Sequence, residues 1–167
     1  PVVTNALTHG LSMVGYLFAD EGQEIIIPDL YWGNYNLIFT QAYHTKFNTF
    51  KLFKGDGFNL EAFEETVLNS PAGKKLILLN FPNNPTGYTP TTDEVEKITE
   101  IIYQAAVKGN QLAVIIDDAY FGFVYEDGIA RESIFSKIAS LHENVLAIKT
   151  CGATKEDYVW GFRVGFI

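Results

Sequence analysis

Runs of apolar residues alternate along this chain with segments of helical periodicity. Two of the runs, at residues 76–79 and 113–116, are apolar at every position, which is typical of strands covered on both faces in a parallel sheet. Strands are predicted at residues 2–5, 24–28, 75–80, 111–117, 145–149 and 162–167. We therefore expect a three-layer α/β/α domain with a mostly parallel central sheet, whose last strand, about 162–167, is a candidate for antiparallel pairing.

The intervals between the predicted strands have the spacing of amphipathic helices. The clearest helix follows Pro90, where Thr91 and Glu94 form a capping-box pattern and apolar residues then recur every three or four positions up to Gly109. A second helix is predicted to begin after Asn59, a residue suited to the N-cap. Others are expected at residues 10–18, 34–41 and 133–140.

The composition is that of a globular protein. The 167 residues are one domain's length, and 47% of them are hydrophobic. The formal net charge of -8 argues against a nucleic-acid partner, because such binding needs clustered Lys and Arg. No apolar run approaches the ~20 residues of a membrane span, so a membrane partner is not expected either.

Cysteine and histidine usage limits the chemistry further. Cys151 is the only cysteine, which excludes an intramolecular disulfide and is consistent with a reducing compartment. His9, His44 and His142 lie far apart without the spacing of metal ligands. We expect a cytoplasmic protein without a metal site.

Polar residues gather just beyond the ends of three predicted strands. Asn84 begins the stretch Asn-Pro-Thr-Gly, Asp117 begins the stretch Asp-Asp-Ala-Tyr that ends at Tyr120, and Lys155 is followed eight residues later by Arg163. The carboxyl ends of parallel strands meet at one edge of a sheet, where such folds bind ligands. An amide, a carboxylate, a phenol, an amine and a guanidinium at that edge could surround one small, anionic, aromatic cofactor.

Each of these residues has an ordinary structural interpretation beside the functional one. Asp117 is either a loop ion pair or N-cap, or a carboxylate that binds a protonated ring nitrogen. Lys155 is either a surface charge or an amine that forms a Schiff base. Arg163 lies among apolar residues, so we expect it to pair with an anion, and a phosphate suits its guanidinium. Trp32 is either core or a platform that stacks on an aromatic cofactor.

Residues 8–10, Thr-His-Gly, fall between the first predicted strand and the first predicted helix. Their backbone N–H groups could hold a phosphate at the helix N-terminus, although an ordinary capped turn explains the same residues. The dinucleotide-binding and P-loop glycine patterns are both absent from the chain.

Taken together, the motifs at 84–87, 117–120 and 155–165 resemble the fold type I pyridoxal-phosphate enzymes, and most closely the class I/II aminotransferases. The match runs in order from Thr8 to Gly165. The resemblance implies the cofactor pyridoxal 5′-phosphate, amino-group transfer between an amino acid and a 2-oxo acid, and a homodimeric parent protein. It also implies a cis peptide bond between Asn84 and Pro85.

The resemblance assigns a catalytic role to three residues. Lys155 would form the Schiff base with the cofactor and later move a proton between the substrate and the cofactor. Asp117, rather than Asp118, would keep the pyridine nitrogen protonated. Tyr120 would donate a hydrogen bond to the phenolic oxygen of the ring and tune the Schiff base.

Further residues would bind the cofactor. Asn84, rather than Asn83, would donate to the same phenolic oxygen, and Trp32 would stack on the ring. The phosphate would be bound by Arg163 and by amides around Thr8 and His9, where His9 stands in place of the Gly or Thr that is common in the family. Gly152 is a second departure, because the family often has there a hydroxyl that contacts the phosphate, and Thr154 is the candidate to compensate.

Family members are considerably longer than this chain. We therefore expect residues 1–167 to be the pyridoxal-phosphate-binding large domain, without the N-terminal segment and the C-terminal small domain, and to be inactive alone. Two other functions share these motifs: a pyridoxal-phosphate-dependent carbon–sulfur β-lyase, and an aminotransferase-like ligand-sensing domain of a transcription regulator.

Overall fold

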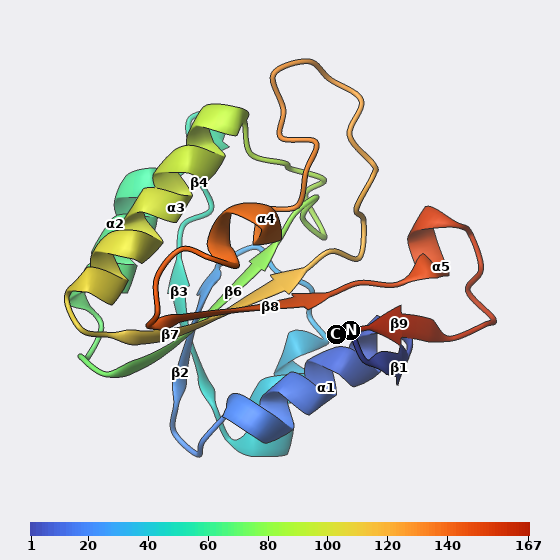
Figure 1. Cartoon of the computed structure of the whole chain (residues 1–167), viewed down its shortest axis with the longest axis horizontal. Helices are drawn as coiled ribbons and strands as arrows, with labels where there is room; N and C mark the ends of the chain where they lie inside the picture. Colours follow the sequence, from blue (N-terminus) through green and yellow to red (C-terminus); the bar gives the residue numbers. More distant parts are fainter.

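A five-stranded parallel sheet forms the centre of the protein. The computed structural model describes all residues from 1 to 167, and its sheet has the order β3-β2-β6-β7-β8 with every neighbouring pair parallel. The strands are β2 (Glu24–Pro28), β3 (Lys46–Phe50), β6 (Lys74–Asn80), β7 (Gln111–Asp117) and β8 (Val145–Thr150). Figure 1 shows helices on both faces of this sheet, which confirms the predicted α/β architecture.

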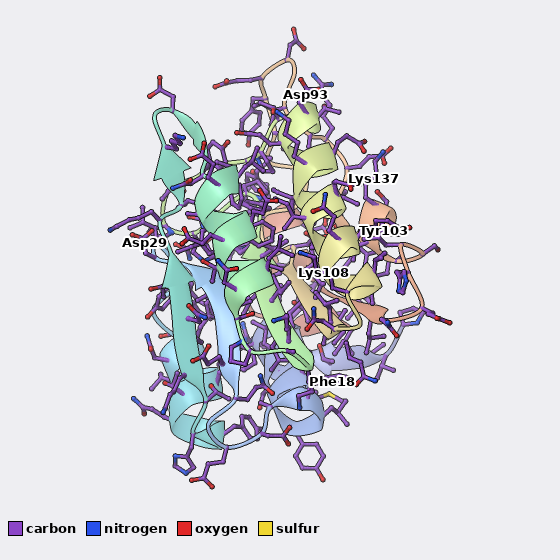
Figure 2. The ribbon with its side chains drawn as sticks, turned by 90° about the vertical axis from the view of Figure 1, so that its left-hand side faces the viewer. Phe18, Asp29, Asp93, Tyr103, Lys108 and Lys137 are labelled. Carbon is purple, nitrogen blue, oxygen red and sulfur yellow. The ribbon has the colours of Figure 1, made fainter.

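Successive side chains along the central strands point to opposite faces of the sheet, so the core is divided into two halves. Ile77, Leu79, Val114 and Ile116 face the half that is covered by α2 (Leu60–Asn69), α3 (Thr92–Val107) and α4 (Phe135–Ile138). Leu76, Leu78, Ala113 and Ile115 face the other half, which is covered by α1 (Ala6–Phe18) and the π-helix η1 (Asn36–Gln41). Figure 2 shows α2 and α3 side by side over the sheet. Strands that are buried on both faces explain the continuous apolar runs.

The predicted helix starts at Thr91 and Asn59 are confirmed. The Thr91 hydroxyl accepts from Glu94 N at 3.2 Å, and a Glu94 carboxylate oxygen accepts from Thr91 N at 2.8 Å. The Asn59 side chain accepts from Ala62 N at 3.1 Å. Glu94 also accepts from Phe58 N at 2.8 Å, so the cap of α3 holds the short hairpin of β4 (Phe53–Lys54) and β5 (Gly57–Phe58).

Several elements differ from the sequence-based prediction, among them β4, β5 and α5 (Ala153–Glu156), which were not predicted. Strand β3 was not predicted, because an edge strand with polar residues at alternate positions has no continuous apolar run. Helix α1 begins at Ala6, four residues earlier than expected, so residues 8–10 lie inside its first turns. Helix α4 covers only Phe135–Ile138 of the predicted 133–140. None of the helices is long and apolar enough to cross a membrane.

The first and last predicted strands do not join the central sheet. β1 (Val3–Asn5) and β9 (Val164–Phe166) form a separate antiparallel pair, which confirms the antiparallel direction of the last strand. Cys151 and Phe166 exchange backbone hydrogen bonds of 3.1 and 2.8 Å, so β9 also contacts the chain directly after β8. Both termini of the chain lie beside this pair (Figure 1), and α5 (Ala153–Glu156) lies in the connection between β8 and β9.

Candidate active site

Three neighbouring strands end at the same level with a polar residue each. Asn80, Asp117 and Thr150 are in register across β6, β7 and β8. The Asn80 amide donates to Asp117 O at 2.8 Å, and its oxygen accepts from Asn84 N at 2.8 Å. Asn80 therefore fixes the 84–87 turn to the end of β7. It was not predicted as a site residue, although a polar residue closing an apolar strand is a signal of the same kind as Asp117.

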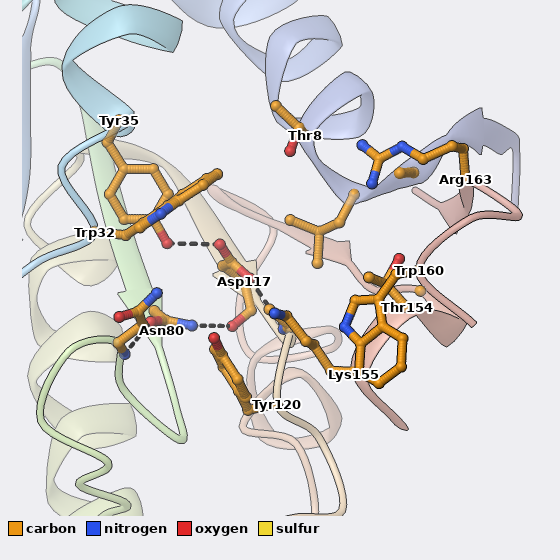
Figure 3. A pocket seen from close by; sticks show the side chains of 15 residues that line it. Thr8, Trp32, Tyr35, Asn80, Asp117, Tyr120, Thr154, Lys155, Trp160 and Arg163 are labelled. Atoms are coloured by element: carbon orange, nitrogen blue, oxygen red, sulfur yellow. Dashed lines mark hydrogen bonds between the residues drawn. The ribbon is translucent and has the colours of Figure 1, made fainter. Parts of the chain in front are cut away.

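A pocket of about 300 Å³ opens beyond these strand ends, a volume at the lower end of the range for small-molecule sites. Its walls come from β7, from the turns after β2 and β6, and from α1, α5 and the loop before β9 (Figure 3). Every predicted site residue except His9 lines it: Thr8, Trp32, Asn84, Asp117, Tyr120, Gly152, Lys155 and Arg163. The structure thus brings together residues that are up to 155 positions apart in the sequence.

His9 lies outside the pocket lining. Its Nδ1 accepts a hydrogen bond from Asn5 N at 3.0 Å, so the side chain turns back to the beginning of α1 and serves that helix end. The physical reason is that β1 leads directly into the helix, which places residues 8–10 within it. Thr8, one residue earlier, directs its hydroxyl into the pocket (Figure 3).

The Asp117 carboxylate is held in place by two hydrogen bonds. It is only 2% exposed; the Tyr35 hydroxyl donates to its Oδ2 at 2.6 Å, and Ala119 N donates to its Oδ1 at 3.0 Å (Figure 3). Burial raises the pKa of Asp117 to about 6, against the opposing effect of these two hydrogen bonds, and the neighbouring charge of Asp118 acts in the same direction as burial.

Tyr35 is the main site residue that the sequence did not reveal. It is fully buried, and burial together with Asp117 raises the pKa of its phenol well above the ordinary value. The phenol therefore stays a neutral donor to Asp117 throughout the physiological range. The sequence did not single it out, because an aromatic residue near a strand end has no sequence feature that separates a core position from a site position.

In each of two motifs, two adjacent residues of the same type were candidates, and the structure shows which of the two faces the pocket. Asp118 points away from the pocket and lies 3.0 Å from Lys149 Nζ, whose ammonium lies 4.7 Å from the Phe121 ring centroid. Asn83 is also turned away, because its side chain accepts from Thr86 N and Oγ1. Asp117 and Asn84 are thus the members that face the pocket.

The Asn84–Pro85 bond is cis, as expected from the resemblance. A second cis bond, which was not predicted, joins Phe81 and Pro82 in the same connection.

Aromatic side chains form much of the pocket wall. The Trp32 and Tyr35 rings meet edge to face, with centroids 5.5 Å apart and an interplanar angle of 86°. Lys155 Nζ lies 5.6 Å from the Tyr120 ring centroid, so the amine and the phenol occupy the same end of the pocket. Trp160, which was not predicted, lines the pocket beside Lys155 (Figure 3).

Thr8 and Arg163 lie toward the α1 side of the pocket (Figure 3), and Thr154 also lines it. Arg163 is exposed and has no carboxylate within ion-pair distance. No anion of the chain itself supplies the pairing expected for it, and its backbone is left-handed, with φ of 52°. Its carbonyl accepts from Ala6 N at 2.8 Å, and Figure 3 shows the guanidinium extending toward the first turn of α1.

Two of the four residues other than glycine that have left-handed backbone line the pocket. Ala6 has φ of 62° and Arg163 has φ of 52°, and both line the pocket. Such conformations are each unfavourable by roughly 1–3 kcal/mol and persist where the surrounding structure enforces them, often at functional sites. No group of three or more His, Cys, Asp or Glu side chains could hold a metal ion.

Comparison with known proteins agrees with this geometry. The family model for aminotransferase class I and II matches residues 1–167. The chain is 31% identical over 166 residues to a "Probable aspartate/prephenate aminotransferase" of Aquifex aeolicus, covering 95% of the chain and 39% of that protein. It is 33% identical over 151 residues to a histidinol-phosphate aminotransferase of Methanococcus maripaludis, covering 90% of the chain and 36% of that protein.

A solved structure supports the same relationship. The crystal structure of an aminotransferase from Anaerococcus prevotii superposes with a TM-score of 0.82 at 27% identity, over 98% of this chain and 41% of that one. The chain therefore spans about two fifths of the length of the proteins that it matches. Because the family model extends over the whole chain, this protein belongs to the aminotransferase class I and II family, whose members depend on pyridoxal phosphate.

Proposed function

We propose that this chain is the cofactor-binding domain of a pyridoxal-phosphate-dependent aminotransferase, which transfers an amino group between an amino acid and a 2-oxo acid. The observation that carries the proposal is the placement of Lys155 and Asp117 in one pocket whose far end holds Arg163. An amine, a buried carboxylate and a guanidinium in this order match the aldehyde, the ring nitrogen and the phosphate of the cofactor.

The donor set of the pocket fits this cofactor. The buried carboxylate of Asp117 suits a protonated ring nitrogen, and the hydroxyls of Thr8 and Thr154 with the Arg163 guanidinium suit a phosphate. Trp32 and Tyr120 supply aromatic surface between these two ends. When bound, pyridoxal phosphate supplies a ring that withdraws electrons from the substrate carbon, while the protein orients the reacting groups.

Each residue then has a definite task. The Lys155 amine would hold the cofactor's aldehyde carbon and carry a proton to and from the substrate carbon. Asp117 would hold the proton on the ring nitrogen, and Tyr35 and Ala119 N fix both of its oxygens for that purpose. The Asn84 amide and the Tyr120 hydroxyl would donate to the phenolic oxygen. We propose all of these roles from the geometry of the pocket.

Substrates and partners of the whole protein remain predictions. The relatives above are named for different substrates, aspartate and prephenate in one and histidinol phosphate in the other. We therefore propose only the class of substrate, an amino acid with a 2-oxo acid acceptor. A homodimeric parent protein and a cytoplasmic location remain predictions from the resemblance.

The decisive experiment compares Lys155→Ala with wild type in the full-length protein that carries this sequence. The wild type should bind pyridoxal phosphate with a visible absorbance band and transfer amino groups to a panel of 2-oxo acids. Lys155→Ala should lose both the band and, by about 10³-fold or more, the transfer rate. Lys108→Ala, an exposed lysine at the end of α3, is the matched control and should behave as wild type.

Two other outcomes would contradict the proposal. Release of pyruvate and ammonia without any oxo-acid acceptor would identify a β-lyase instead. Cofactor binding with neither reaction, in a protein that carries a helix-turn-helix segment, would favour the ligand-sensing domain.

A further inference from the structure

Trp160 is the one aromatic residue of the pocket to which the proposed function gives no task. Its side chain lines the pocket beside Lys155 (Figure 3), yet the residue is 54% exposed and belongs to neither half of the hydrophobic core. An indole has a large apolar surface, and burying that surface is favourable. Its exposure beside a cavity therefore marks a place where an apolar group of a ligand would bind.

A row of aromatic rings holds Trp160 in position. The ring centroids of Tyr120 and Phe123 lie 6.2 Å apart, and those of Phe123 and Tyr158 lie 6.4 Å apart. The ring of Tyr158 then meets the indole of Trp160 at 5.8 Å, with an interplanar angle of 61°. The row joins the residues after β7 to the loop between α5 and β9, so the indole is placed by contacts between two segments of the chain.

Both ends of this row border Lys155. The Lys155 Nζ lies 5.6 Å from the centroid of the Tyr120 ring, and Figure 3 shows the Trp160 indole on the other side of the Lys155 side chain. In the proposed function this amine carries a proton to and from the substrate carbon. Because the substrate side chain is attached to that carbon, it begins close to the amine and within reach of the indole.

The charged groups of the pocket already have partners in the proposed function. Asp117, Lys155 and Arg163 are the only charged side chains among the residues that line it, and all three are assigned to the cofactor. The walls that this chain forms thus leave no charge to pair with a carboxylate or an ammonium group on the substrate side chain. What remains beside the amine is an indole, which favours flat aromatic groups through stacked or edge-to-face contact.

We propose that Trp160 is a specificity-determining residue, whose indole contacts the side chain of the amino-acid substrate and favours substrates with an aromatic side chain. The inference rests on the proposed function, because it names the substrate class of that same reaction. An aromatic side chain that covers the indole removes apolar surface of both groups from water. The methyl group of alanine is too short to do so.

The test measures transfer and binding separately in the full-length protein loaded with pyridoxal phosphate. We determine kcat/KM for phenylalanine and for alanine with a saturating 2-oxo acid. Calorimetry gives dissociation constants for phenylpropionate and propionate, two acids that lack an amino group and cannot react. The wild type should prefer the aromatic member of each pair. Trp160→Ala should lower kcat/KM for phenylalanine and weaken phenylpropionate binding, each about tenfold, with alanine and propionate unchanged.

Two further variants serve as matched controls. Trp160→Phe retains an aromatic ring and should keep most of the preference for the aromatic ligands. Tyr103→Ala removes a partly exposed aromatic ring of α3 that lies outside the pocket lining and should change neither ratio. All variants should bind pyridoxal phosphate as the wild type does, because Trp160 is placed at the substrate and not at the cofactor.

Three outcomes would overturn the inference while the proposed function stands. They are a wild type that transfers amino groups without preferring the aromatic ligands, an equal loss for both members of a pair in Trp160→Ala, and a gain for phenylalanine in that variant. An equal loss would show a merely structural role, and a gain would show that the indole limits the size of the substrate side chain. A wild type that transfers amino groups from no amino acid would refute the proposed function, and the inference with it.

Discussion

Asp117 shows how individual residues define this site. A carboxylate at a strand end is common, but this one is buried, receives hydrogen bonds from Tyr35 and Ala119 N, and has its carbonyl bound by Asn80. Two conflicting effects set its charge: burial raises its pKa to about 6, while the hydrogen bonds favour ionisation. A carboxylate that titrates near neutrality and is held rigidly suits the binding of a protonated ring nitrogen.

The raised pKa gives a pH-dependent stability at the residue scale. Below pH ~4 the Asp117 carboxyl is neutral in both the folded and the unfolded chain, so its full contribution to stability is present. That contribution is lost as the pH rises through about 6, because the folded cofactor-free protein must then hold a buried charge. The change in pKa from 3.8 to about 6 corresponds to about 3 kcal/mol.

Asp117→Asn cannot ionise, so its free energy of unfolding relative to wild type should rise by about 3 kcal/mol between pH 4 and pH 7. Urea unfolding of the cofactor-free proteins at both pH values measures this difference. Asp56→Asn, which changes an exposed carboxylate, is the control and should show little pH-dependent difference. If the free energies of unfolding of wild type and Asp117→Asn change in parallel with pH, the pKa of Asp117 is not raised in the folded protein.

At the scale of elements, β9 shapes the part of the pocket that holds Arg163, the residue proposed to bind the phosphate. It lies between the residues that follow β8 and the start of α1, with glycine at both contacts. The carbonyl of Arg163, just before β9, accepts from Ala6 N at 2.8 Å. The position of Arg163 in the pocket therefore depends on the close approach of β9 and α1.

Gly165→Ala should disturb this arrangement, because its Cβ atom would lie 2.5 Å from Ala6 C and backbone atoms cannot rotate away. We expect a loss of about 1–3 kcal/mol in the free energy of unfolding and weaker binding of pyridoxal phosphate. Gly161→Ala is the matched control, since a Cβ atom there has no heavy atom within 4 Å. Equal stability of the two variants in urea unfolding would contradict the steric argument.

At the scale of the whole molecule, the pocket joins parts that the sheet alone does not hold together. Its lining comes from both ends of the chain and from the ends of the central strands. A ligand that contacts all of these parts binds only the folded state. Cofactor binding should therefore be linked to global unfolding and not only to local order.

Removal of the cofactor should lower the stability of the full-length protein. At a pyridoxal phosphate concentration 100 times the dissociation constant, the free energy of unfolding should be higher by about 2.7 kcal/mol than in the cofactor-free protein. Urea unfolding at several cofactor concentrations measures this linkage, with Lys155→Ala as the comparison that should show a much smaller increase. A midpoint that does not depend on cofactor concentration would contradict binding at this pocket.

The sequence alone determined the layered architecture and most of the pocket. Apolar runs at 76–79 and 113–116 require burial on both faces, and the polar residues that follow them must then lie at one sheet edge. The placement of residues 117–118 at that edge was predictable for this reason, whereas the choice of Asp117 over Asp118 and the role of Lys155 came from the family resemblance. The capping box at Thr91 was predictable because it is a local pattern of the chain.

Only the tertiary structure decided which distant residues complete the site. Tyr35 reaches Asp117 across 82 positions, and nothing in its neighbourhood in the sequence distinguishes it from a core aromatic. His9 turned away from the pocket because the helix begins at Ala6. The exclusion of side chains at Gly152 depends on the backbone of β9. These outcomes follow from packing between segments far apart in the chain, which no local pattern specifies.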